Sequence, residues 1–153
     1  MWGLGKKSLP AVMTHKGAFH MSQENNKVTI RRFYDEVINQ KKLAVIEELF
    51  GASYVSHDLP SDPTELKHFI NSFHVAFPDG QITIEEVIAE GDTVAMRGTF
   101  CGTQTGQFQN IPPTGKTVTV PAQDIYHLSE GKIVEHWGGP NLLRLLQQLG
   151  VIP

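Results

Sequence analysis

The sequence predicts a single α+β domain in which helices come first and a bent sheet of consecutive strands follows. Apolar residues recur with a helical period before Pro78-Asp79-Gly80, and with a period of two after it. Helices followed by a run of strands indicate an α+β domain rather than an alternating parallel fold. A bent antiparallel or mixed sheet wrapped around the N-terminal helices would form a half-closed barrel with a ligand site in its mouth.

Three helical segments are predicted before the sheet. The first begins at Asn25 or Asn26, and the second covers about residues 43–50. The third has Asp62 as its N-cap, with a proline at its first position and a glutamate at the capping-box position. The link at residues 53–58 is expected to be extended or irregular. The apolar face of the first helix consists of Ile30, Phe33, Tyr34, Val37 and Ile38.

Four strands and a final helix are predicted after residue 80. The strands are rich in valine, isoleucine, threonine and aromatic residues, and cover residues 81–90, 93–103, 116–128 and 132–138. Residues 90–92 and 129–131 contain glycine and are expected to form hairpin turns. A longer loop with two prolines joins the second strand to the third, and the last helix ends at Gly150.

The bulk composition restricts the class of protein. A net charge of −3 argues against a nucleic-acid partner, and the apolar runs are too short to cross a membrane. The one cysteine, Cys101, cannot form an internal disulfide, and no cysteine cluster suggests a zinc site. These features predict a cytoplasmic protein.

Residues 1–20 differ from the rest of the chain because they contain three lysines and no acidic residue. Their apolar stretch is too short, and is interrupted by Pro10, for a secretory signal. We predict a disordered leader or an added extension before a natural start at Met21, and a domain that covers residues 21–153.

Several segments of the chain are shared with a known family. Residues 102–116 contain a Pro-Pro-Thr-Gly-Lys run, residues 124–128 and 131–137 read Asp-Ile-Tyr-His-Leu and Gly-Lys-Ile-Val-Glu-His-Trp, and residues 145–150 close the pattern. These segments resemble the SnoaL-like (polyketide cyclase-like) branch of the nuclear transport factor 2-like superfamily. The resemblance extends over about residues 25–150.

The resemblance implies a cone-shaped barrel that forms a homodimer, has an apolar pocket and uses no metal or organic cofactor. Cyclases of this group close a ring by an intramolecular aldol step on a polyketide ester. Their acid/base carboxylate lies two positions after the histidine that matches His136, and this chain has Gly138 there. The family's Gly-Thr-His is also changed, to Gly-Thr-Gln at Gln104. The first change argues against an unaltered cyclase mechanism, because glycine cannot transfer a proton.

Asp124 and His136 are the candidate catalytic pair. If residues 129–131 form a three-residue turn that closes on Leu128 and Lys132, Asp124 lies directly opposite His136, about 5 Å away at Cβ. A two-residue turn would shift the register by one residue and separate them. An acid and an imidazole on an apolar concave face can form an acid/base dyad, and the alternative is a structural hydrogen bond. The same face would carry Val118, Val120, Ala122, Tyr126, Val134 and Gly138.

Five more residues are candidates for contact with the substrate. His57 reaches the pocket rim or caps a turn, and Arg97 either faces inward to bind a carboxylate or enolate or is solvated outside. Tyr126 donates to an oxyanion or lines the core. Gln104 is a candidate through the family motif, and Gly138 leaves space for a larger ligand or a water bound to His136.

Three functions follow from these residues. The first is a cofactor-free isomerase or cyclase that acts on a small apolar carbonyl compound, with Asp124 or His136 as the base. The second is an epoxide or ester hydrolase, which usually needs two carboxylates beside an arginine, whereas only Asp124 and Arg97 are visible. The third is a non-catalytic protein that binds a small apolar molecule or forms a dimer through its sheet, and Gly138 supports it.

Overall fold

The computed structural model describes residues 15–153 of the chain. Helix α1 (His15–Arg32) continues directly into a π-helical segment (Phe33–Asn39). The predicted start at Asn25 or Asn26 is therefore about ten residues too late. No proline interrupts residues 15–32, so the helix can extend in the N-terminal direction. Most of the predicted leader, residues 1–14, lies outside the described residues, and the backbone of residues 15–20 belongs to α1.

The remaining helices are shorter than α1, and two of them begin at side-chain caps. A 3₁₀ turn (Leu43–Val45) leads into α2 (Ile46–Leu49). Helix α3 (Pro63–Ala76) starts at the predicted cap, where the Asp62 side chain accepts hydrogen bonds from two backbone N–H groups. Helix α4 (Leu142–Gln148) follows the last strand and is capped by Asn141.

The sheet has five strands in the order β1-β5-β4-β3-β2. The four predicted strands are present, and the fold is α+β as predicted. The fifth, β1, pairs in parallel with β5, so the sheet is mixed, and β1 replaces most of the link that was expected to be irregular. The strands are β1 (Phe50–Ser56), β2 (Gln81–Glu90), β3 (Thr93–Thr103), β4 (Thr117–Ser129) and β5 (Lys132–Pro140).

The β4–β5 hairpin has a different register from the predicted one. Its loop has two residues, Glu130 and Gly131, which both adopt positive φ angles of 51° and 75° and leave Ser129 paired with Lys132. A bulge between the pairs Leu128–Ile133 and His127–Glu135 then adds one residue to β5. The bulge restores the original parity, with the result that His136 again points to the same face as Asp124.

Because of this register, Asp124 lies opposite Gly138, and His136 lies opposite Tyr126. The predicted direct pairing of Asp124 with His136 is wrong, and the two residues meet across a diagonal of the hairpin instead. Val134, predicted on the inner face, is the bulged residue, while its neighbour Ile133 is fully buried there.

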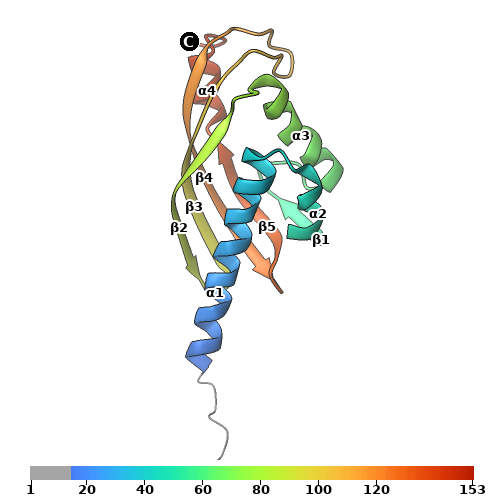
Figure 1. Cartoon of the computed structure of the whole chain (residues 1–153), viewed down its shortest axis with the longest axis vertical. Coiled ribbons are helices and arrows are strands. Elements are labelled where there is room, and N and C mark those ends of the chain that lie inside the picture. The colour runs from blue at the N-terminus through green and yellow to red at the C-terminus, as the bar shows by residue number, and fades with distance from the viewer. Residues whose placement is uncertain (1–14) are drawn as a thin grey trace, which may run out of the picture.

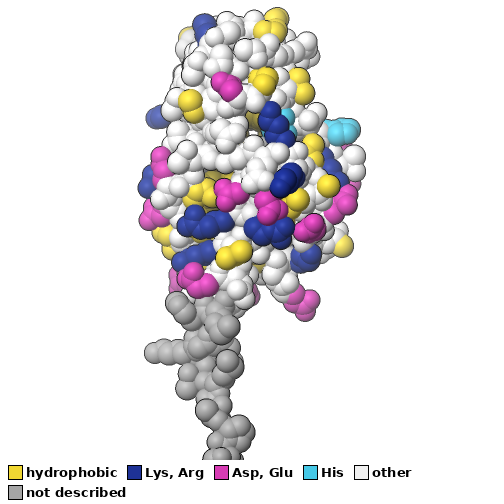
Figure 2. Space-filling view, viewed as in Figure 1, with side chains coloured by type: hydrophobic (Ala, Val, Ile, Leu, Met, Phe, Trp, Pro, Cys, Tyr) yellow, Lys and Arg dark blue, Asp and Glu magenta, His cyan; other side chains and the backbone are white. Residues whose placement is uncertain are grey.

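Helices α1 and α3 cover one face of the bent sheet, and the core lies between them (Figure 1). Even-numbered residues of β3 and β4 alternate inward, including Val94, Met96, Val118 and Val120. The odd-numbered residues of these strands form the outer face. On the molecular face seen in Figure 2, basic side chains lie among acidic ones. Ion pairs between such side chains include Arg32–Glu36 and Lys67–Glu47. Within residues 15–153, no helix combines the length and hydropathy needed to span a membrane.

Candidate active site

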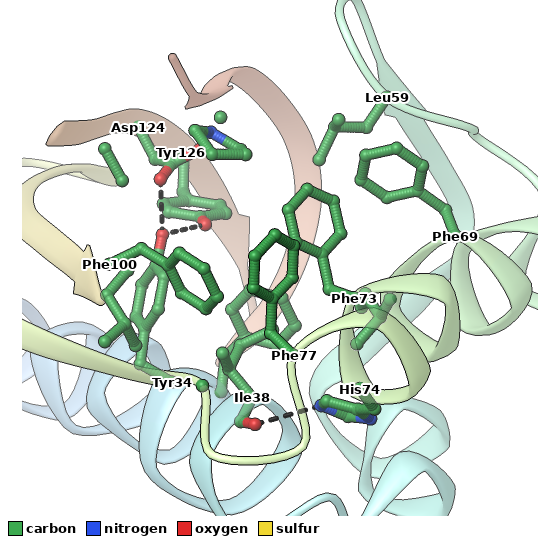
Figure 3. A pocket seen from close by; sticks show the side chains of 17 residues that line it. Tyr34, Ile38, Leu59, Phe69, Phe73, His74, Phe77, Phe100, Asp124 and Tyr126 are labelled. Atoms are coloured by element: carbon green, nitrogen blue, oxygen red, sulfur yellow. Dashed lines mark hydrogen bonds between the residues drawn. The ribbon is translucent and has the colours of Figure 1, made fainter. Parts of the chain in front are cut away.

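A cavity of about 90 Å³ lies between the inner face of the sheet and helices α1 and α3. Its walls are mostly aromatic and aliphatic, and the middle is formed by Phe69, Phe73, Phe77 and Phe100 (Figure 3). A buried water needs only about 10–15 Å³ by this measure, so the cavity has room for more than a single water. An apolar cavity with a few polar groups is the usual form of a small-molecule site.

Asp124 places its carboxylate at one end of this cavity, where it is held from two sides. Its Oδ2 accepts a hydrogen bond from the Tyr34 hydroxyl at 2.7 Å, and its Oδ1 lies 2.6 Å from Nε2 of His136. The exposed fractions of Asp124 and His136 are only 5% and 1%, so both bonds are shielded from water. The structure therefore brings together the two residues that were predicted to pair.

The hydroxyls of Tyr34 and Tyr126 lie 2.5 Å apart, beside the carboxylate. Because Tyr34 donates its single proton to Asp124, Tyr126 must donate to Tyr34. Burial, followed by nearby charged groups that include Asp124, raises the pKa of both phenols well above the ordinary value. Both tyrosines are therefore neutral hydrogen-bond donors at pH 7, and both line the cavity.

His74 lines the cavity from helix α3, away from Asp124 (Figure 3). Its Nε2 donates to the backbone oxygen of Ile38 at 2.9 Å, because a carbonyl can only accept. Burial lowers the pKa of His74, which favours a neutral imidazole. The cavity thus contains one carboxylate and one neutral imidazole that are separated by aromatic rings.

His136 bonds to Asp124 but does not itself line the cavity. Its Nδ1 lies 2.9 Å from the hydroxyl of Ser56, and its ring packs against Tyr126 at a centroid distance of 4.9 Å. It is absent from the residues that line the cavity, whereas Asp124, Tyr34 and Tyr126 are among them. A ligand would therefore contact Asp124 directly and His136 only through Asp124. Elsewhere in residues 15–153, no group of three His, Cys, Asp or Glu side chains could hold a metal ion.

The structure does not bring Arg97 or His57 into the cavity, which corrects their predicted places. Arg97 has the outward parity of β3, and its guanidinium pairs with Glu85 and Glu86 on the outer face. His57 stacks on Trp137 at 4.7 Å and bonds to Glu135, also on the outer face. Alternation alone places Arg97 outside, since its neighbours in β3 at positions 94, 96 and 100 are buried.

Gln104 is fully buried but lies in the loop after β3, away from the cavity. Its Oε1 accepts from the backbone N and the hydroxyl of Thr114, at 3.2 and 2.7 Å. Its Nε2 donates to the backbone oxygens of Ile111 and Pro112. These four bonds hold the loop closed, so the predicted contact with the substrate is corrected to a structural role.

Comparison with known proteins agrees with this architecture. A family model described as SnoaL-like polyketide cyclase matches residues 28–149. The chain belongs to the SnoaL-like polyketide cyclase family. Among proteins with curated descriptions, none matches the chain in sequence.

Several solved structures share the fold over most of this chain. AclR from Streptomyces galilaeus, named as a candidate hydroxylase, is 28% identical with a TM-score of 0.76, over 86% of this chain and 99% of its own. IdmH from Streptomyces antibioticus, named as a candidate polyketide cyclase, is 28% identical with a TM-score of 0.70, over 82% of this chain and 98% of its own. A SnoaL-like protein from Jannaschia is 22% identical with a TM-score of 0.76, over 97% of this chain and 100% of its own, which shows the fold alone.

Gly138 departs from the SnoaL-like pattern noted in the sequence, and its backbone leaves no space in the direction that a side chain would take. Its φ is +105°, and a Cβ placed there would lie 2.1 Å from the backbone oxygen of Gln123. The backbone N–H of Gly138 donates to the carboxylate of Asp58 at 2.7 Å. The room predicted at Gly138 is therefore not where a side chain would lie, although Gly138 borders a separate hollow together with Asp58 and Leu142. The neighbouring Gly139 lines the cavity in its place.

Tyr34 is the residue of the SnoaL-like site that sequence reasoning missed. It lies on the π-helical continuation of α1, and its hydroxyl joins Asp124 to Tyr126. In the sequence it was one of five apolar positions on a helix face. The signal that could have found it is chemical, since a buried tyrosine usually needs a partner for its hydroxyl, and π-helical turns are frequent at functional sites.

Proposed function

We propose that the chain is a cofactor-free cytoplasmic enzyme that moves a proton on a small apolar carbonyl compound, as an isomerase or a cyclase. The observation that carries this proposal is the carboxylate of Asp124 at the end of an aromatic cavity, beside two neutral phenols. A base and neutral donors that meet at one point in an apolar site are the groups that enolate chemistry needs.

The proposed reaction begins when Asp124 takes a proton from the carbon next to the substrate carbonyl. The electron pair of that C–H bond moves to the carbonyl oxygen, and the resulting enolate accepts a hydrogen bond from Tyr126, whose hydroxyl turns from Tyr34 to the enolate oxygen. In an isomerase, Asp124 returns the proton to a different carbon. In a cyclase, the enolate carbon attacks a second carbonyl, and the new alkoxide takes the proton from Asp124.

The hydrolase alternative has less support in the structure. Opening an epoxide with an activated water usually requires two carboxylates beside an arginine. Asp124 is the one carboxylate among the described residues that line the cavity, and Arg97 is on the other face of the sheet. We therefore rank proton transfer above hydrolysis.

The test uses 5-nitro-1,2-benzisoxazole, a flat aromatic probe of general bases. Removal of its C3 proton breaks the N–O bond and gives a coloured 2-cyano-4-nitrophenolate, so no co-reactant is needed. We expect turnover by the wild type, and a loss of about 100-fold or more in Asp124→Asn. The control is Asp79→Asn, an exposed carboxylate that bonds to the Thr103 backbone and should leave the rate unchanged.

Two outcomes would contradict the proposal. Equal rates for Asp124→Asn and wild type would show that Asp124 is not the base. If the probe and related apolar compounds raise the melting temperature without any turnover, the chain is a binding protein of the same fold, which is the alternative function.

The outer face of the sheet supports a further part of the proposal, a homodimer. Ile88, Ala95, Ile125 and Trp137 lie side by side in register across four strands, and the exposed fractions of Ile88 and Ile125 are 55% and 46%. A second copy would cover this row around a two-fold axis. Light scattering at micromolar concentration should give a dimer for wild type and a monomer for Ile125→Glu. A monomeric wild type would refute the dimer.

A further inference from the structure

We infer that Leu59 is a specificity-determining residue of this site, which sets the length of the compounds that the cavity accepts by separating the cavity from a second hollow. The inference deepens the proposed function and rests on it for its consequence in catalysis. The second hollow is lined by Asp58, Leu59, Gly138, Gly139, Pro140 and Leu142. Leu59, Gly139 and Pro140 also line the cavity that contains the Asp124 carboxylate. The two spaces therefore meet at these three residues.

Of the three shared residues, Leu59 is the one with a flexible side chain. Gly139 has no side chain, and the ring of Pro140 is closed onto its own backbone. The Leu59 side chain packs over Gly139, since its Cδ2 lies 3.6 Å from the point where a Cβ on Gly139 would be. The Leu59 side chain is therefore the part of the boundary that a substitution can enlarge or reduce.

The loop between β1 and α3 fixes the position of Leu59. The backbone N–H of Leu59 donates to the Ser56 hydroxyl at 3.0 Å. The carboxylate of Asp58 accepts from the backbone N–H of Gly138 at 2.7 Å, which ties the loop to the end of β5. Pro60 follows Leu59 and restricts its backbone to extended conformations. These constraints hold the Leu59 side chain at the boundary.

The position of Leu59 limits the far end of a ligand. Figure 3 shows Leu59 at the edge of the cavity, away from Asp124. A compound that has its reacting carbon at Asp124 and fills the cavity has its other end against Leu59 and Phe69. The substrate is therefore a compact apolar carbonyl compound, and a longer chain fits only when Leu59 is replaced by a smaller residue. Asp58 is the one charged residue that lines the second hollow, so a chain that enters it must not be anionic.

The test uses uncharged straight-chain phenyl ketones, from acetophenone to octanophenone, and measures their Kd by isothermal titration calorimetry. In the wild type we expect Kd to fall about fourfold with each added CH₂ group that is buried, and to stop falling once the chain reaches Leu59. In Leu59→Ala we expect Kd to go on falling for about three more carbons, the number that the substitution removes. Leu59→Phe adds volume at the boundary, so the decrease should stop at a shorter chain.

Leu143→Ala is the matched control. Leu143 is an exposed leucine of α4 that lines neither space, so the same substitution there should leave the limiting chain length unchanged. The same limiting chain length in wild type, Leu59→Ala and Leu59→Phe would overturn the inference, and so would a wild type that binds none of the ketones. The binding constants do not depend on turnover. A shifted limit without turnover of the benzisoxazole would therefore refute the proposed function and leave the role of Leu59 intact.

Discussion

The molecule contains two buried polar clusters that differ in what surrounds them. One joins Asp124, Tyr34, Tyr126 and His136 inside the sheet, and the other joins Gln104 to the backbone of its own loop. Among the described residues, every buried side-chain nitrogen and oxygen has a hydrogen-bond partner. Burial and complete hydrogen bonding therefore do not distinguish the two clusters.

The difference lies in ionisable groups and in access to a cavity. The Asp124 cluster contains a carboxylate, two phenols and an imidazole, and three of its members line the cavity. The Gln104 cluster contains an amide, a hydroxyl and backbone groups, none of which gains or loses a proton at ordinary pH. The cluster with ionisable groups beside a cavity is therefore the candidate functional site. The cluster without them holds its loop in place.

The largest expected effect that sharpens this comparison is a loss of stability in Gln104→Leu. The substitution leaves two backbone oxygens and the backbone N of Thr114 without the partner they have now. We expect the free energy of unfolding to fall by about 3 kcal/mol, since each lost partner of a buried group costs about 1–3 kcal/mol. Urea unfolding measures this change.

The rate with the benzisoxazole probe should change little in Gln104→Leu, because the residue does not line the cavity. Gln107→Leu, an exposed residue of the same loop, is the control, and its stability should stay within about 0.5 kcal/mol of wild type. The comparison breaks down if Gln104→Leu keeps its stability but loses turnover.

A smaller effect is expected in the other cluster for Tyr34→Phe. The variant removes the hydroxyl that bonds to both Asp124 and Tyr126. We expect a rate about tenfold lower with the same probe, because a hydrogen bond to a charged group contributes about 1.5 kcal/mol or more. Initial rates at pH 7 measure it.

Tyr54→Phe is the matched control for this prediction. Burial raises the pKa of Tyr54 to about 12, so it is also a buried neutral phenol, but it is absent from the cavity lining. Its rate should equal that of wild type. Equal losses in the two variants would show that any buried phenol, rather than its place beside Asp124, affects the rate.

Most of the fold could be predicted because its signals are local. Alternation and turn residues gave β2 to β5 to within two residues at each end, and Asp62 marked the start of α3. Strand β1 was missed because its only strand partner, β5, lies about 80 residues away, and parallel pairing leaves no local pattern. The two-residue turn had been considered as an alternative, but the bulge that compensates it in parity was missed.

The site was less predictable because its geometry depends on contacts between distant segments. Asp124 and His136 belong to one hairpin, so their shared face could be inferred from parity. Tyr34 is 90 residues from Asp124 in the chain, and only the packing of α1 against the sheet brings them together. Gln104 and Gly138 were selected through a family motif, which gives position in the sequence but not the direction of a side chain.

The backbone at Gly138 limits how this site can be redesigned. A Cβ at this position would meet the backbone oxygen of Gln123 at 2.1 Å, on a backbone with φ of +105°. A carboxylate therefore cannot be added at position 138 by one substitution unless the end of the strand moves with it. New acids for this cavity have to be introduced at other lining positions, where the backbone already accepts a side chain.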